Sequence, residues 1–201
     1  MPFALHGIAV SPGFAVGRAH RVARAVLEVP RQRIAPEQVD AEVQRLKAAQ
    51  QQVAAELERL RRELPADAPE EMGAFLEVHG LILNDPLLTS GPAALIRERC
   101  YNAEWALSTQ LDELSRQFDL VEDEYLRERK ADIEQVVERV LKMLAHGPDS
   151  VSSAGLPLPE LAEAGLIVVA HDIAPADMLG FRGHRFAGFV TDAGGKTSHT
   201  A

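Results

Sequence analysis

The sequence has little cysteine and no long hydrophobic run. Cys100 is the only cysteine among 201 residues, so neither an internal disulfide nor a thiolate metal cluster can form. No stretch approaches the ~18 apolar residues that a membrane-spanning helix needs. The opening residues also lack the basic segment and apolar run of a signal peptide. These absences predict a soluble, cytoplasmic protein in a reducing compartment.

Positive charge is also scarce. The chain has 21 Lys and Arg against 30 Asp and Glu, a formal net charge of −9. This balance argues against general affinity for nucleic acid or anionic membranes and is compatible with a basic protein partner. The hydrophobic content of 46% is ordinary for a globular chain, and the length suits one large domain or two small ones.

The middle of the chain has the periodicity of helices. Apolar residues at spacings of three, four and seven predict a long helix over residues 36–64, because such spacing places them on one helix face. Similar stripes predict further helices over about 70–83, 103–118 and 123–145. Short links between amphipathic helices favour a four-helix bundle made of two helical hairpins.

The two ends of the chain have the texture of strands instead. "HGIAV" and "FAVGRAHRV" near the start, and "GLIVVA" and "RFAGFVTD" near the end, predict short strands, with "PADML" as a short helix between the last two. Strand, helix, strand is an α/β pattern. We therefore predict an α/β domain made of residues 1–29 and 148–201, interrupted by an inserted all-α domain of residues 30–147.

The loop "AGGKTSH" follows the last predicted strand, where α/β sheets commonly carry their sites. The two glycines can expose backbone N–H groups, a Thr or Ser can cap a following helix, and the lysine adds a cation, which together suit a phosphate. These cradle residues are Gly194, Gly195, Lys196, Thr197 and Ser198. His199, next along the chain, would then be a nucleophile toward phosphorus, because neutral imidazole is abundant near neutral pH. A plain glycine-rich turn with a surface histidine explains the same residues equally well.

"TDAGGKTSHTA" resembles the phosphohistidine signature of Enzyme I of the phosphoenolpyruvate-dependent sugar phosphotransferase system. "GIAVSPGFAVGRA", "EDEYLRERKADIEQVVERVL" and "HDIAPADM" resemble other segments of that family, in the same order. The resemblance implies an α/β phosphohistidine (swivelling) domain with an inserted four-helix domain. It also implies that His199 accepts a phosphoryl group from phosphoenolpyruvate through Nε2 and passes it to the histidine-containing phosphocarrier protein.

The resemblance further places the carrier's docking surface on the helical domain. It implies docking roles for Glu70, Glu71, His79, Leu88, Phe118, Leu126 and Arg129. Each has a structural alternative: the two glutamates offset a helix dipole, and the apolar residues could equally belong to the core. For His79 we favour a packed, hydrogen-bonded core histidine.

Two departures from the family pattern matter. Ala174 stands where the family often has a hydroxyl residue that hydrogen-bonds the active histidine. The family also continues past the histidine, so we expect this chain to be an N-terminal fragment. The missing C-terminal domain would carry the phosphoenolpyruvate site, the Mg²⁺ site and the homodimer contact. We expect no metal site in the chain itself, and no use of phosphoenolpyruvate without the missing part.

Other functions remain possible from the sequence. The chain could belong to a nitrogen-related or multidomain-fusion Enzyme I variant. The swivelling domain of another enzyme that uses phosphoenolpyruvate, such as pyruvate phosphate dikinase, shares the Gly-Gly-…-His loop but lacks an inserted helical domain of this kind. A helical interaction module without chemistry is the alternative of a different class.

Overall fold

The structure is a computed structural model. It describes residues 4–22, 29–66, 68, 70–120, 124–146, 165–170, 173 and 186–192. The chain divides into two compact units, one of Met1–Ala25 with Ser153–Ala201 and one of Val26–Ser152. Each unit is described by itself below.

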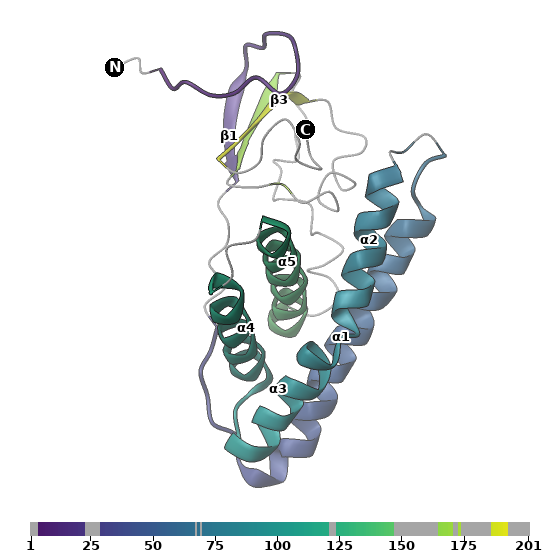
Figure 1. Cartoon of the computed structure of the whole chain (residues 1–201), viewed down its shortest axis with the longest axis vertical. Coiled ribbons are helices and arrows are strands. Elements are labelled where there is room, and N and C mark those ends of the chain that lie inside the picture. Colours follow the sequence, from purple (N-terminus) through teal and green to yellow (C-terminus); the bar gives the residue numbers. More distant parts are fainter. Residues whose placement is uncertain are drawn as a thin grey trace. The chain divides into compact units, whose positions relative to one another are not determined.

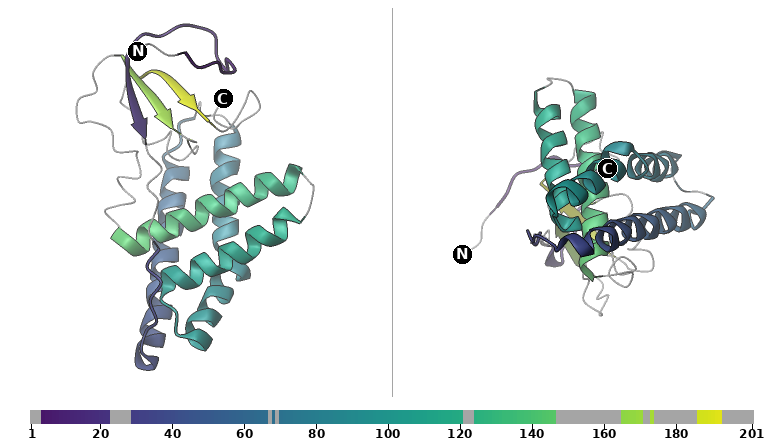
Figure 2. Two further views of the ribbon diagram at one scale, coloured as in Figure 1. Left: turned by 90° about the vertical axis from the view of Figure 1, so that its left-hand side faces the viewer. Right: turned by 90° about the horizontal axis from the view of Figure 1, so that it is seen from below.

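The unit of Val26–Ser152 is helical (Figure 1). A 3₁₀ turn, η1 (Pro36–Gln38), leads into α1 (Val39–Arg62), followed by α2 (Glu70–Leu83), α3 (Pro86–Arg99), α4 (Ala103–Asp119) and α5 (Glu124–His146). The long α1 packs against α2 and α3 together, and α4 packs against α5. Figure 2 shows the α4–α5 pair crossing the other helices. The predicted arrangement in two hairpins is therefore observed.

Five α-helices occupy the described part of this unit, where four were predicted. The additional helix is α3, which follows Asn84 and Asp85 in the stretch between the helices predicted over about 70–83 and 103–118. Asp85 has extended backbone angles, and its carboxylate accepts the Leu87 N–H at 2.8 Å. Pro86 follows at the first helical position, where its missing N–H costs nothing. A new helix therefore starts here instead of the old one continuing.

The core of the helical unit follows the predicted stripe on α1. Val43, Leu46, Val53 and Leu57 are all buried. Fully burying one such side chain is worth about 1.5–3 kcal/mol, so this helix owes its stability mainly to packing. The predicted inner face of α2 is also confirmed, with Phe75, Leu76, His79, Ile82 and Leu83 buried.

The other unit contains a parallel three-stranded sheet in the order β1-β2-β3. The strands are β1 (Arg18–Val22), β2 (Leu166–Ala170) and β3 (Phe186–Thr191). β2 lies in the centre with Leu166, Val168 and Ala170 buried, as the apolar run predicted. The pairing of β1 with β2 joins residues from the two ends of the chain, which confirms that the N-terminal strand region meets the C-terminal one.

One predicted strand is wrong. Residues of "HGIAV" form no strand; Ile8 within the segment is 74% exposed, and Leu5 just before it is 87% exposed. A strand gains its stability from a hydrogen-bonded neighbour and a buried face, and this segment has neither. The short helix predicted for "PADML" lies outside the described residues.

No helix within the described ranges combines the length and apolar character needed to cross a membrane.

Candidate functional site

The predicted phosphate cradle and His199 lie outside the described residues, and so does Ala174. The structure does describe the strand that leads to the cradle. β3 ends at Thr191, which is paired with Ala170 at the end of β2, and the Asp192 N–H donates to the Ala170 carbonyl at 3.3 Å. The carboxyl ends of two parallel strands thus lie side by side just before the predicted loop. This edge is the usual position for a site in an α/β sheet.

A close approach of two glycines shapes the start of this sheet. A Cβ built on Gly17 would stand 1.8 Å from the carbonyl oxygen of Gly165, and that carbonyl accepts the Arg18 N–H at 2.9 Å. Gly165 itself has a φ of 103°, which side chains rarely allow. The close approach of the two backbones therefore requires a position without a side chain at Gly17, whereas glycine at Gly165 is favoured by its positive φ.

The predicted docking residues that the structure describes divide between surface and core. Glu70 and Glu71 are exposed in the first turn of α2, and Arg129 is exposed on α5. Phe118 is half-buried near the end of α4. Leu88, in contrast, is 3% exposed and contributes to the core. Leu126 belongs to α5, but its side chain lies outside the described part.

Among the predicted docking residues whose side chains the structure describes, His79 is the most deeply buried, at 1% exposed. Its ring packs on Phe75 with centroids 3.9 Å apart, and its Nε2 lies 3.7 Å from Asp132 Oδ1 on α5. That distance is too long for a hydrogen bond, and neither ring nitrogen finds a hydrogen-bond partner among the described residues. The expected core packing is confirmed, whereas the expected hydrogen bond is absent from the part of the chain described.

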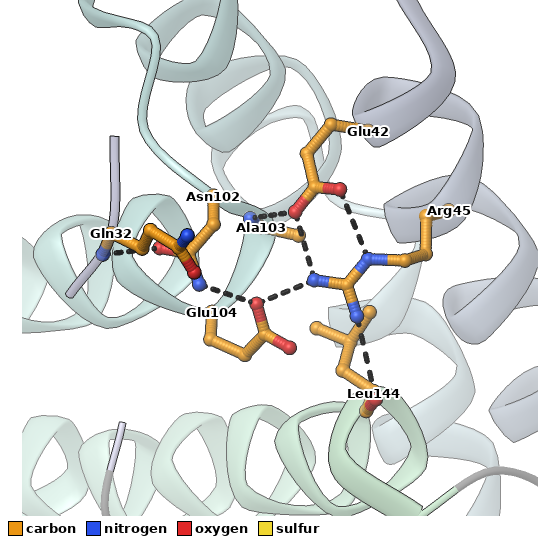
Figure 3. Close-up of polar contacts among 7 residues, drawn as sticks. All are labelled: Gln32, Glu42, Arg45, Asn102, Ala103, Glu104 and Leu144. Carbon is orange, nitrogen blue, oxygen red and sulfur yellow. Dashed lines mark hydrogen bonds and ion pairs between the residues drawn. The ribbon is translucent and has the colours of Figure 1, made fainter. Parts of the chain in front are cut away.

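A polar cluster centred on Arg45 was not predicted from the sequence (Figure 3). Arg45, on α1, makes two hydrogen bonds to Glu42 at 2.8 and 3.1 Å and one to Glu104 of α4 at 2.5 Å. Its third nitrogen donates to the Leu144 carbonyl of α5 at 3.4 Å. One guanidinium therefore connects three helices.

The same cluster also binds the segment that precedes α1, through hydrogen bonds between Gln32 and Asn102. Asn102 donates to Glu104 at 2.8 Å and accepts the Gln32 N–H at 3.2 Å, while Glu42 accepts the Ala103 N–H at 2.7 Å. The backbone adds a further bond, because Asn102 N–H donates to the Gln32 carbonyl at 2.9 Å. The i,i+3 spacing of Glu42 and its arginine was visible in the sequence, but Glu104 lies 59 residues further on.

The cluster changes the titration of two of its members. Burial raises the pKa of Glu42, but the hydrogen bonds from Arg45 and the Ala103 N–H outweigh it and leave that pKa below the ordinary value. The hydrogen bond to Glu42 raises the pKa of Arg45 above its ordinary value. Both groups are therefore charged at neutral pH, and their interaction is structural.

No group of three or more His, Cys, Asp and Glu side chains in the described ranges is placed to hold a metal ion.

Comparison with known proteins decides the family. Residues 6–129 match the family model described as PEP-utilising enzyme, N-terminal, and residues 162–201 match the one described as PEP-utilising enzyme, mobile domain. The chain belongs to the family of PEP-utilising enzymes. The first match runs from before β1 to the start of α5, and the second runs from before β2 through the predicted loop.

One relative of this chain is a phosphoenolpyruvate-protein phosphotransferase of Cupriavidus necator. It is 62% identical over 206 residues, which covers 100% of this chain and 35% of the relative. The chain thus spans about a third of the length of this relative. The match confirms the resemblance to Enzyme I on which the sequence-based prediction rests.

Two solved structures share the fold. One, described as an NMR solution structure of Enzyme I (nEIt), has a TM-score of 0.72 at 27% identity and covers 98% of this chain and 77% of that one. The other is described as the N-terminal domain of Enzyme 1 - Nitrogen. It has a TM-score of 0.64 at 24% identity, and the match covers 96% of this chain and 75% of that one. At that identity the second likeness concerns the fold alone.

Proposed function

We propose that this chain is the phosphohistidine and carrier-docking part of a phosphoenolpyruvate-protein phosphotransferase. The observation that carries the proposal is the 62% identity, over the whole chain, to a protein of that name. The sequence of the loop "AGGKTSH" also supports the proposal, since a nucleophilic imidazole follows residues that suit a phosphate. The site acts in the cytoplasm, as part of a transferase of the sugar phosphotransferase system.

The proposed reaction is a relay through His199. Its neutral Nε2 attacks the phosphorus of phosphoenolpyruvate, an N–P bond forms, and the P–O bond to the enolpyruvate oxygen breaks. In the second half the N–P bond breaks as the carrier's histidine attacks the same phosphorus. Backbone N–H groups at Gly194 and Gly195, with the cation of Lys196 and the hydroxyls of Thr197 and Ser198, would hold the phosphoryl oxygens.

The two units would divide this work. We assign the sheet-containing unit to the α/β phosphohistidine domain and the helical unit to the inserted domain that docks the histidine-containing phosphocarrier protein. The exposed Glu70 and Glu71 suit a partner with basic residues around its active histidine, because opposite charges steer association. Arg129 and the half-buried Phe118 lie at the surface, as docking residues must.

The remaining parts of the reaction belong to a longer protein in this proposal. The chain covers 35% of the Cupriavidus necator relative, so a further domain would supply the phosphoenolpyruvate and Mg²⁺ sites and the homodimer contact. The chain by itself would exchange phosphoryl groups with the carrier but would not use phosphoenolpyruvate.

A phosphoryl-transfer assay from the carrier tests the relay. The chain is incubated with a sugar-system phosphocarrier carrying ³²P on its histidine, and the label on the chain is measured after acid and after alkali. We expect an acid-labile, alkali-stable label, because phosphoramidates hydrolyse in acid. His199→Ala should carry none, and His184→Ala, which changes a histidine outside the proposed site, should carry the wild-type amount.

Label on His199→Ala equal to that on the wild type would refute the assignment. If the wild-type chain binds the carrier but takes up no label, the relay is refuted and the chain acts as a helical interaction module instead. A second arm uses the nitrogen-system carrier at the same concentration. Faster labelling from that carrier would place the chain in the nitrogen-related branch of the family.

A further inference from the structure

A groove between α1 and the α2–α3 segment belongs to neither proposed activity. Its volume is about 400 Å³, within the range of about 300–1,000 Å³ usual for small-molecule sites. Its described lining comes from α1, α3, the last residue of α2 and the residue after it. The lining residues are Val43, Leu46, Lys47, Gln50, Gln51, Ala54, Leu83, Asn84, Thr89, Ser90, Ala93 and Arg97.

The charge of the groove is opposite to that of the chain. Lys47 from α1 and Arg97 from α3 are both exposed, and the described lining residues include no Asp or Glu. Neither cation forms an ion pair with any residue in the described ranges. The whole chain has a net charge of −9, so two cations that have no ion-pair partner among the described residues form a local site for negative charge.

The uncharged residues of the groove form an apolar floor and a polar rim. Val43, Leu46 and Leu83 are buried beneath it. The buried Gln50 donates its side-chain N–H to the Leu88 carbonyl at 2.7 Å, which ties α1 to the first turn of α3. Ser90 and Gln51 stand exposed at the rim and can donate hydrogen bonds.

We propose that this groove binds a small organic molecule with two anionic groups, carboxylate or phosphate. Each cation, one from each flanking helix, would pair with one anionic group, while the carbon body of the ligand covers the apolar floor. Such charge-assisted hydrogen bonds are the strong ones, and the amide and hydroxyl groups at the rim complete them. The site is independent of the His199 relay, so its presence does not rest on the proposed function.

An NMR titration with 3-phosphoglycerate, which carries one phosphate and one carboxylate, tests this site. We expect saturable shifts in the backbone amides of residues 46–54, 84 and 89–97 of the ¹⁵N-labelled chain. Lys47→Gln and Arg97→Gln should each raise the dissociation constant by about tenfold, the effect of losing one charge-assisted hydrogen bond. Ser90→Trp, at an exposed position, should abolish binding by filling the groove.

Matched variants separate the site from general attraction to positive charge. Arg61→Gln on α1 and Arg99→Gln on α3 remove the same charge from exposed residues outside the groove, and both should bind as the wild type does. Titrations with inorganic phosphate and with succinate then show which anionic group dominates. Shifts that never saturate, or an equal loss of affinity in Arg99→Gln, would overturn the proposal.

Discussion

At the scale of single residues, the structure depends on charges that meet inside the helical unit. The side chains of Glu42 and Glu104 are 13% and 9% exposed, and one guanidinium satisfies both. A mostly buried carboxylate without a partner is costly, because it has lost water without gaining a counter-charge. The main cost of removing Arg45 would therefore be two mostly buried carboxylates without a counter-charge, and not the loss of any one hydrogen bond.

Arg45→Met should lower the free energy of unfolding by about 1–3 kcal/mol, since it leaves two carboxylates without their main partner. Urea denaturation followed by circular dichroism measures this. Arg116→Met is the matched control, because its ion pair with Glu113 is exposed on both sides and should contribute under about 1 kcal/mol. An equal effect of the two substitutions would show that burial of the Arg45 cluster has no energetic consequence.

The lowered pKa of Glu42 predicts a dependence of stability on pH. The ordinary pKa is 4.5 and the folded one lies below it, so the unfolded chain binds the proton more readily. The Glu42 contribution is therefore complete above that ordinary value and is lost as pH falls toward and through the folded pKa. Urea unfolding at about pH 6 and at about pH 3.5 should show a smaller loss of stability on acidification in Glu42→Gln than in the wild type. A loss of the same size in both would contradict this.

At the scale of elements, the ends of helices and strands depend on short-range backbone chemistry. The Asp85–Pro86 pair starts α3, and only Asn84 and Asp85 lie between the end of α2 and the start of α3. In the sheet, Gly17 and Gly165 allow β1 to reach β2. In both places one or two residues decide whether neighbouring elements form as they do.

Gly17→Ala should disrupt the pairing of β1 with β2. The new Cβ would stand 1.8 Å from a backbone oxygen, a contact that only a shift of the backbone can relieve. Amide hydrogen exchange should show lost protection at Arg18–Val22 while α1 and α4 keep theirs. Gly7→Ala is the control, since nothing lies within 4 Å of its added Cβ. Unchanged protection of β1 in Gly17→Ala would show that the close approach is not needed for pairing.

At the scale of the whole molecule, the two units have separate cores. Buried side chains of α1 contact the other helices, and α1 is also tied to α5 by the Arg139–Glu56 ion pair at 2.9 Å. The ions of that pair are 11% and 10% exposed. All of these contacts lie within Val26–Ser152.

A chain of residues 26–152 should therefore fold alone. Circular dichroism should give a helical spectrum and a single cooperative thermal transition, because the packing that stabilises the helices is retained. Leu46→Ala, at a side chain 1% exposed, should destabilise this shorter chain and the full one alike, by about 2–5 kcal/mol. A non-cooperative transition of the shorter chain would mean that residues outside 26–152 complete its core.

Much of the fold was predictable from local pattern. The stripe on α1 and the apolar run of β2 are periodic signals carried by neighbouring residues, so both elements were predicted correctly. The "HGIAV" strand was predicted wrongly, because strand pattern is only a preference until a partner supplies hydrogen bonds. The Arg45 cluster was missed because its acids come from helices far apart in sequence. The His199 site stays a prediction from the loop and the resemblance.

The sequence by itself determined where α1, α2, α4 and α5 form, which face of α1 is apolar, and which family the loop before His199 resembles. These properties depend on residues close together along the chain. Only the tertiary structure decided that Arg45 joins three helices, that His79 is buried beside Asp132, and that Lys47 and Arg97 line one groove without a carboxylate. Such juxtapositions arise from packing between distant segments, which no local spacing encodes.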